Sequence, residues 1–136
     1  MSSKHIEEIL NLPVQTNMRP LPPTASLDDP VSVVVNTMVR ENIGAVIIVD
    51  ANNPAGILTE KDILDKVVNL KKDMSLTKAR DVMSEPIFSI EQDRPIKEAL
   101  KIMRQNNIRR LPVTKDGVVV GIVSERRLLE VAFLVT

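Results

Sequence analysis

One nine-residue pattern occurs twice in this chain, as GILTEKDIL at residues 56–64 and as GIVSERRLL at residues 121–129. The two copies are 65 positions apart, and the same shift aligns residues far upstream of them. Without a gap it pairs Asp28 with Asp93, Pro30 with Pro95, Met38 with Met103, Asn42 with Asn107, and Met18 with Met83. Self-similarity at a fixed spacing is the signature of a repeat, so the chain is interpreted as a tandem duplication.

Each copy predicts the order strand, helix, strand, strand, helix. The first helix of copy one is expected to begin at Asp28-Asp29-Pro30, with an acidic cap and Pro at the first helical position. Apolar residues then recur at helical spacing, and a continuous apolar run, a turn and a return strand follow. The predicted elements are residues 22–27, 30–42, 45–49, 55–58 and a helix capped by Thr59 in copy one, and residues 87–90, 95–107, 111–113, 118–123 and a helix capped by Ser124 in copy two.

The composition excludes most catalytic chemistries. Among the 136 residues there is no Cys, and His5 is the single His, so disulfide frameworks, thiolate zinc sites, catalytic triads and histidine metal clusters are ruled out. The sequence offers no nucleophile with a matching base, and we expect no enzyme, no catalytic residue and no metal site. Trp and Tyr are absent, which removes a base-stacking platform for nucleic acid.

The charge and the apolar runs bear on partners and location. Eighteen Lys and Arg balance eighteen Asp and Glu, so no net field favours nucleic acid or a membrane surface. The first residues lack the apolar core of a signal peptide. The longest apolar runs, at residues 45–49 and 118–123, are too short to cross a bilayer. We therefore predict a cytoplasmic protein without a membrane partner.

These motifs resemble the CBS domain, and specifically the tandem pair called a Bateman module. The resemblance rests on the two nine-residue patterns, on the strand Asn107-Ile108-Arg109-Arg110-Leu111-Pro112-Val113, and on the lead-in Asp81-Val82-Met83. It covers nearly all of residues 14–132. It implies an α/β fold of two small sheets packed about a pseudo-two-fold axis, with clefts between the repeats. We expect an N-terminal helical extension at residues 1–13, repeat one at 14–70 and repeat two at 71–136, both repeats forming one module.

The resemblance also implies a regulatory ligand. CBS pairs look like sensors of adenosine-containing molecules such as AMP, ADP, ATP and S-adenosylmethionine. In that pattern a hydroxyl meets phosphate, a carboxylate binds the ribose, the first strand of the partner repeat contacts adenine, and basic residues meet phosphates. The residues carried over to this site are Thr59, Asp62, Ile57, Leu58, Ile87, Phe88, Ser89, Arg109 and Arg110. No cofactor is required beyond such a nucleotide.

The pair Thr59 and Asp62 has two interpretations on residue chemistry alone. Three positions apart at a helix start, both side chains lie on the first turn, where a carboxylate accepts the two hydroxyls of a ribose well. The same spacing is that of a capping box, which needs no ligand. Phe88 has a similar alternative, because a lone Phe in a short apolar segment is commonly part of the core.

The second copy breaks the ribose motif. Arg127 stands where copy one has Asp62, and a cation at a helix start opposes the helix dipole. An anion, Glu125 or another carboxylate would compensate it, or the arginines point into solvent. Residues 24–64 carry two basic and six acidic side chains, whereas residues 89–129 carry nine and five, net charges of −4 and +4. A second cleft, with Thr24, Ser124 and Arg127, is therefore expected to bind adenosine poorly.

Three classes of function follow. The first is a non-catalytic sensor that binds an adenosine nucleotide and signals to an effector protein the sequence does not identify, with the chain forming a homodimer. The apolar end at residues 131–135 is either part of that dimer interface or simple packing of the last helix. The second class is a structural or dimerisation module without a ligand. The third, nucleic-acid binding through basic repeat two, is disfavoured by the neutral charge and the lack of aromatic residues.

Overall fold

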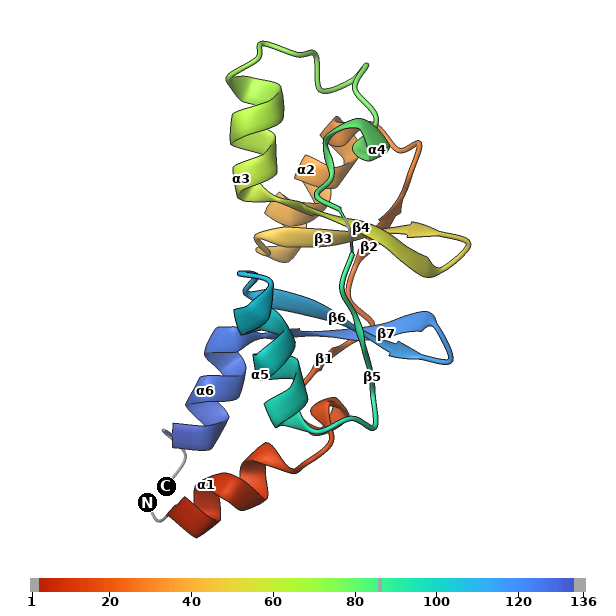
Figure 1. The fold of residues 1–136 in the computed structure, drawn as a ribbon. Coiled ribbons are helices and arrows are strands. Elements are labelled where there is room, and N and C mark those ends of the chain that lie inside the picture. Colours follow the sequence, from red (N-terminus) through yellow and green to blue (C-terminus); the bar gives the residue numbers. More distant parts are fainter. Residues whose placement is uncertain (1–2, 86, 134–136) are drawn as a thin grey trace. The chain divides into compact units, whose positions relative to one another are not determined.

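The chain forms two compact units in a computed structural model that describes residues 3–85 and 87–133. Unit 2 is one continuous segment, Pro22–Ile87, while unit 1 combines the first 21 residues with those from Phe88 onwards. Each unit has one small sheet, with its helices on one face (Figure 1). The predicted mixed α/β fold with two small sheets is confirmed.

Unit 2 contains the first copy of the repeat. Its sheet has the order β2-β3-β4, in which β2 (Thr24–Ser26) runs parallel to β3 (Ala45–Asp50), and β3 is antiparallel to β4 (Asn53–Thr59). The helices are α2 (Val31–Glu41), α3 (Glu60–Ile63), which continues as the π-helical segment η2 (Leu64–Val68), and α4 (Ala79–Val82). Val34 and Val46 are fully buried in the core between this sheet and α2. The predicted order of elements is present.

Unit 1 contains the second copy and the N-terminal segment. Its four-stranded sheet has the order β1-β7-β6-β5. The elements are α1 (Ser3–Leu10), η1 (Val14–Thr16), β1 (Arg19–Pro20), β5 (Ile90–Glu91), α5 (Ile96–Gln105), β6 (Arg110–Lys115), β7 (Val118–Ser124) and α6 (Glu125–Phe133). From β5 to α6 they repeat the order seen in unit 2. Met103, Leu111 and Leu128 are fully buried at the centre of this core.

The segment that leads into each copy packs on the sheet of the other copy. In unit 1, β1 pairs antiparallel with β7, and the side chain of Met18 occupies the space a Cβ of Gly121 would need. In unit 2, Ser84 pairs with Ile57, and Met83 covers Gly56 in the same way. A Cβ at either strand position would force the methionine side chain to shift, because that side chain lies directly against the glycine backbone. Each of the two aligned methionines thus precedes one copy of the repeat and packs against the sheet of the other copy.

Two local expectations are corrected by the structure. Pro30 and Pro95 occupy the N-cap positions rather than the first helical positions, and no acidic side chain caps either helix. The amide of Val31 donates instead to the Thr77 carbonyl at 2.8 Å, and the Asp29 carboxylate accepts from the Ser26 amide at 2.8 Å. A backbone carbonyl therefore satisfies the first helical amide, which a side-chain cap was expected to do.

The first strands are shorter than expected. Strand pairing in repeat two starts at Ile90, which faces Val113, so residues 87–89 precede β5 rather than forming it. The predicted hairpins are present, with Ala51 and Asp116 both at φ 51° in their turns. Among the described residues, no helix is both long and apolar enough to span a membrane.

Candidate ligand site at Asp62

The side chains of Thr59 and Asp62 meet where β4 ends and α3 begins. Thr59 is the N-cap, and its hydroxyl accepts the Asp62 amide at 3.2 Å. In return, Asp62 Oδ2 accepts the amide and the hydroxyl of Thr59, each at 3.0 Å. The sequence placed these two residues correctly on one helical turn, and they form a complete capping box.

The second oxygen of Asp62 is equally occupied. Oδ1 accepts the hydroxyl of Ser84 at 2.7 Å and the ammonium of Lys66 at 3.0 Å. A carboxylate has about four lone-pair positions, and four donors fill them here. Because Asp62 is only 6% exposed, this buried charge is compensated entirely by the protein's own groups.

The surroundings keep Asp62 ionised. Burial raises the pKa of Asp62, but hydrogen bonds from the Thr59 amide, Ser84, Lys66 and the Thr59 hydroxyl outweigh it. Together they hold the pKa of this carboxyl below its ordinary value of 3.8. At neutral pH the site therefore presents a charged acceptor beside two hydroxyl groups.

Sequence reasoning missed two members of this cluster, Ser84 and Lys66. Lys66 follows Asp62 by four positions, the spacing at which opposite charges meet on a helix, so this partner had a readable signal. Ser84 lies beside Asp62 because its backbone pairs with Ile57, and no local sequence signal predicts that pairing. Lys66 also donates to the Val82 carbonyl at 3.0 Å, which gives its ammonium a second partner.

The other predicted residues of unit 2 differ in accessibility. Leu58 is fully buried in the core, so only its backbone is available to a ligand. Ile57 is half-buried on β4 and exchanges backbone hydrogen bonds with Ser84. Thr24 is exposed at the start of β2, and Ile87 is half-buried at the end of the unit.

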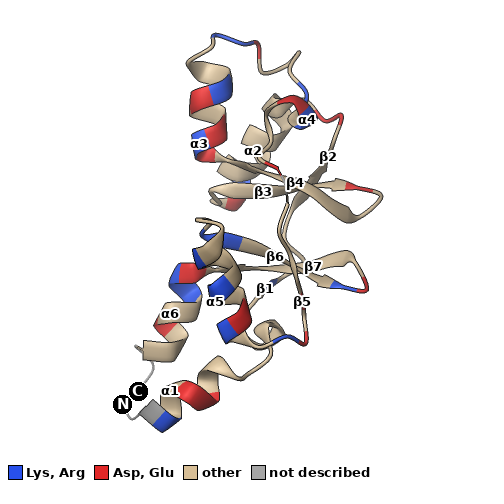
Figure 2. Cartoon of the chain, in the orientation of Figure 1, with Lys and Arg blue, Asp and Glu red and all other residues tan. Residues whose placement is uncertain are grey.

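Unit 1 lacks the carboxylate cluster at its matched position. The Ser124 hydroxyl accepts the Arg127 amide at 3.1 Å, as expected of a cap. The two arginines at the start of α6 lie near one carboxylate, since Glu130 is 3.1 Å from Arg126 and 3.9 Å from Arg127. Glu130 is thus the neighbouring acid that offsets them, and Figure 2 shows blue, basic positions where α5 ends and where α6 begins. The apolar end predicted at residues 131–135 begins on α6, and its residues 134 and 135 lie outside the described chain.

The remaining predicted residues of unit 1 divide between core and surface. Phe88 is half-buried and packs against the unit 1 core, whereas Ser89 is exposed. Arg109 and Arg110 are both exposed, and the Arg109 carbonyl accepts the Glu125 amide at 2.9 Å. Among the described residues, no cluster of three acidic or histidine side chains is placed to hold a metal ion.

Comparison with known proteins decides the family. The family model of the CBS domain matches residues 6–69 and 79–133. The chain belongs to the CBS-domain family. Among curated CBS relatives, an uncharacterized protein of Methanopyrus kandleri is 42% identical over 69% of this chain and 49% of its own length. The mitochondrial CBS domain-containing protein CBSX3 of Arabidopsis thaliana is 33% identical over 71% of this chain and 50% of its own. This CBS chain thus spans about half the length of these relatives.

Solved CBS structures agree with this assignment. A putative signal-transduction protein with CBS domains from Burkholderia ambifaria is 27% identical, with a TM-score of 0.76 over 85% of each chain. The CBS domain of a membrane protein from Sphaerobacter thermophilus is 26% identical, with a TM-score of 0.79 over 93% of this chain and 91% of that one. The chain is therefore a tandem module of a regulatory family.

Proposed function

We propose that this CBS module is a non-catalytic sensor that binds an adenosine-containing ligand through Asp62. The observation that carries the proposal is the buried, ionised carboxylate at the first turn of α3, within the repeated family motif. A ribose presents two adjacent hydroxyl donors, and an ionised carboxylate accepts both. The adjoining Thr59 hydroxyl, which donates to Asp62 in the free protein, turns to the phosphate side of such a ligand when the ribose hydroxyls take its place.

Binding requires an exchange of donors, because the lone pairs of Asp62 are already filled. Lys66 is the donor that leaves most readily, since it is partly exposed and keeps the Val82 carbonyl as a partner. The Ser84 hydroxyl is able to rotate away as the ribose hydroxyls arrive. The ligand thus replaces internal donors on Asp62 with its own, and the released ammonium of Lys66 is the change that binding makes in the protein.

Arg127, at the position in repeat two that matches Asp62, has no carboxylate to offer a ribose, so we expect this position to bind adenosine poorly. The proposed module acts in the cytoplasm and passes its signal to an effector protein.

A titration with nucleotides tests the proposal. Isothermal calorimetry of the wild-type chain with AMP, ADP, ATP, S-adenosylmethionine, GMP and inorganic phosphate is expected to show saturable binding of the adenosine ligands. Asp62→Asn abolishes that binding, and Arg127→Asn at the matched position does not. Lys66→Met removes the competing donor and tightens binding by up to about fivefold, the value of about 1 kcal/mol for a partly exposed ion pair.

A structural module is the second candidate, favoured by the complete satisfaction of Asp62 within the protein. It is supported if the folded chain binds none of these ligands and Lys66→Met changes nothing. Nucleic-acid binding would instead show affinity for DNA or RNA that falls steeply with salt.

A further inference from the structure

Methionine supplies all the oxidisable sulfur of this protein. The chain contains six Met and no Cys, so a peroxide meets thioethers and no competing thiol. Oxidation to the sulfoxide turns a flexible apolar side chain into a polar one, and methionine sulfoxide reductases reverse the change. What oxidation does to the fold therefore depends on what each methionine sulfur contacts.

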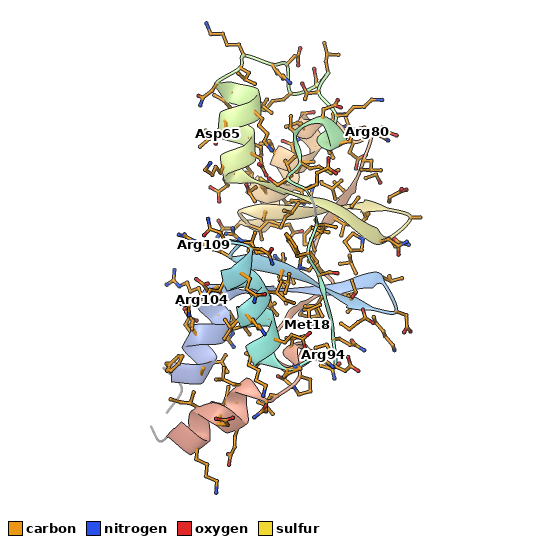
Figure 3. All side chains as sticks on the ribbon, viewed as in Figure 1. Met18, Asp65, Arg80, Arg94, Arg104 and Arg109 are labelled. Carbon is orange, nitrogen blue, oxygen red and sulfur yellow. The ribbon has the colours of Figure 1, made fainter. Side chains whose placement is uncertain are left out.

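Two methionines hold equivalent positions in the segments that lead into the two copies. Met18 directly precedes β1 in unit 1 (Figure 3), and Met83 directly follows α4 in unit 2. Both side chains are half-buried. Among atoms of other segments, the Met83 sulfur lies nearest to the point where Gly56 would carry a Cβ, and the Met18 sulfur has the same place at Gly121. The oxidisable atom itself thus forms the contact with the strand.

Few hydrogen bonds hold each lead-in segment beside its methionine. In unit 2, the Ser84 amide donates to the Ile57 carbonyl at 2.8 Å, and the Ile57 amide donates back to the Ser84 carbonyl at 3.2 Å. In unit 1, β1 is a strand of two residues, and the Leu21 amide donates to the Val120 carbonyl at 3.0 Å. Segments with so few bonds open locally at low free-energy cost, so the methionine packing beside them matters for their attachment.

The other described methionines lie in different surroundings. Met38 on α2 is 7% exposed, and the matched Met103 on α5 is fully buried. An oxidant reaches these two only when the cores open. Met74 is half-buried, like Met18 and Met83, but it packs at the edge of the unit 2 core. Met74 is therefore a matched comparison for accessibility without the lead-in contact.

We propose that Met18 and Met83 are paired oxidation sites, at which formation of the sulfoxide detaches a lead-in segment from the sheet that it covers. Hydrogen peroxide transfers one oxygen atom to the sulfur and leaves as water, so the sulfur loses an electron pair and the peroxide gains it. In the reverse step, catalysed by a reductase, two thiols become a disulfide and the oxygen leaves as water.

The packing explains why the segment is released. An oxygen added between the sulfur and the glycine backbone has no room, and its dipole is poorly accommodated against an apolar core. The side chain then turns towards solvent, and the short backbone attachment beside it opens. This response rests on packing and not on the proposed ligand, so either proposal stands if the other fails.

Peptide mass mapping after treatment with hydrogen peroxide tests the sites. Met18 and Met83 are expected to gain oxygen at least about tenfold faster than Met38 and Met103, because the buried pair reacts only through opening of the core. Equal rates for Met83 and the fully buried Met103, or for Met18 and Met103, overturn the proposal.

Hydrogen exchange on the treated chain tests the release. The amides of Leu21, Ile57 and Ser84 are expected to exchange at least about tenfold faster than in the untreated chain. Treatment with the two methionine sulfoxide reductases, one for each sulfoxide epimer, is expected to restore the slow exchange. Oxidation of Met18 and Met83 that leaves these amides unchanged overturns the proposal.

Leucine variants separate the two sites, because Leu has nearly the volume of Met and is not oxidised. In peroxide, Met18→Leu is expected to keep Leu21 protected while Ser84 opens, and Met83→Leu is expected to show the reverse. Met74→Leu leaves both responses as in the wild type. Opening that persists when positions 18 and 83 are both Leu overturns the proposal. The reductase reversal uses the native chain, so it decides the question even where a leucine variant is loosened before treatment.

Discussion

Replacing Asp62 by Asn removes the charge at the first turn of α3 while keeping the shape of the side chain. An amide has one acceptor oxygen, so the Asn cannot accept from both sides. We expect that oxygen to stay with the Thr59 amide and hydroxyl, while the amide nitrogen donates to Ser84, whose hydroxyl rotates to accept it. The capping hydrogen bonds are then kept, but their acceptor is no longer charged and the ion pair with Lys66 is lost.

The expected loss is about 1–2 kcal/mol of unfolding free energy at pH 7. Hydrogen bonds to a charged group contribute about 1.5–3 kcal/mol and those between neutral groups about 0.5–1.5 kcal/mol, so removal of the charge weakens the bonds that Thr59 and Ser84 make here. The ion pair with Lys66 adds little, because its ammonium is partly exposed and retains the Val82 carbonyl. Surface substitutions normally change stability by less than about 0.5 kcal/mol, so the effect stands well clear of that background.

Urea unfolding followed by far-ultraviolet circular dichroism measures this loss, because the chain has no Trp or Tyr to report by fluorescence. Arg127→Asn is the matched control at the exposed position of the second copy, and it is expected to change stability by less than about 0.5 kcal/mol. The pKa of Asp62 is lower in the folded state than its ordinary 3.8, so its contribution is complete above pH 3.8 and disappears as pH falls through the lowered value. The difference between wild type and Asp62→Asn should therefore be constant near neutral pH and shrink below 3.8. Equal losses at positions 62 and 127, or a difference that grows in acid, would refute this reasoning.

Four further substitutions have expected effects on stability that thermal unfolding can measure. Gly56→Ala places a methyl group against the side chain of Met83 and should cost about 1–3 kcal/mol, partly recovered when Met83→Ala is added. Gly121→Ala should cost more, because its new Cβ also comes within 3.0 Å of the Arg19 carbonyl oxygen, which cannot rotate away. Ala51→Asp should raise stability by about 0.5–1 kcal/mol, because Ala51 has φ 51° and the matched Asp116 tolerates the same angle; no gain would show that this turn is not strained. Arg127→Asp should stabilise α6 by about 1 kcal/mol by completing a capping box with Ser124, and a loss would show that Arg127 makes a contact worth more than its 3.9 Å approach to Glu130 suggests.

The sequence predicted the parts of this fold that depend on local pattern. The buried strand at residues 45–49, the hairpin after it and the cap at Thr59 each have a signal within a few residues, and all three are present. The pairing of Ser84 with Ile57 has no such signal, because residues 27 positions apart meet only through the tertiary fold. The same holds for the contact between Met18 and Gly121. The repeat aligns Met18 with Met83 and Gly121 with Gly56, but the alignment does not show which methionine contacts which glycine.

The candidate site shows the same division. Asp62 and Thr59 were identified from their spacing, but their partners Ser84 and Lys66 were not, so the sequence left the carboxylate with free acceptor positions that the structure fills. The helix start at Pro30 was misplaced by one residue for a related reason. The backbone carbonyl of Thr77 satisfies the first helical amide there. The residues around Pro30 carry no signal for this contact, because Thr77 is distant in the sequence.

The division of the chain into units has a consequence for the order in which they form during synthesis. Unit 2 is uninterrupted from Pro22 to Ile87, so all of its strands have been made before any of repeat two's helices emerge from the ribosome. Unit 1 must wait, because β1 is made before unit 2 and its register partner Ile122 is made after it. Until β7 has been made, Arg19 and Pro20 have no strand to join. We therefore expect residues 22–87 to fold co-translationally, with the two parts of unit 1 closing only after β7 has been made. A duplication of two similar sequences thus yields one half that folds early and one that folds later.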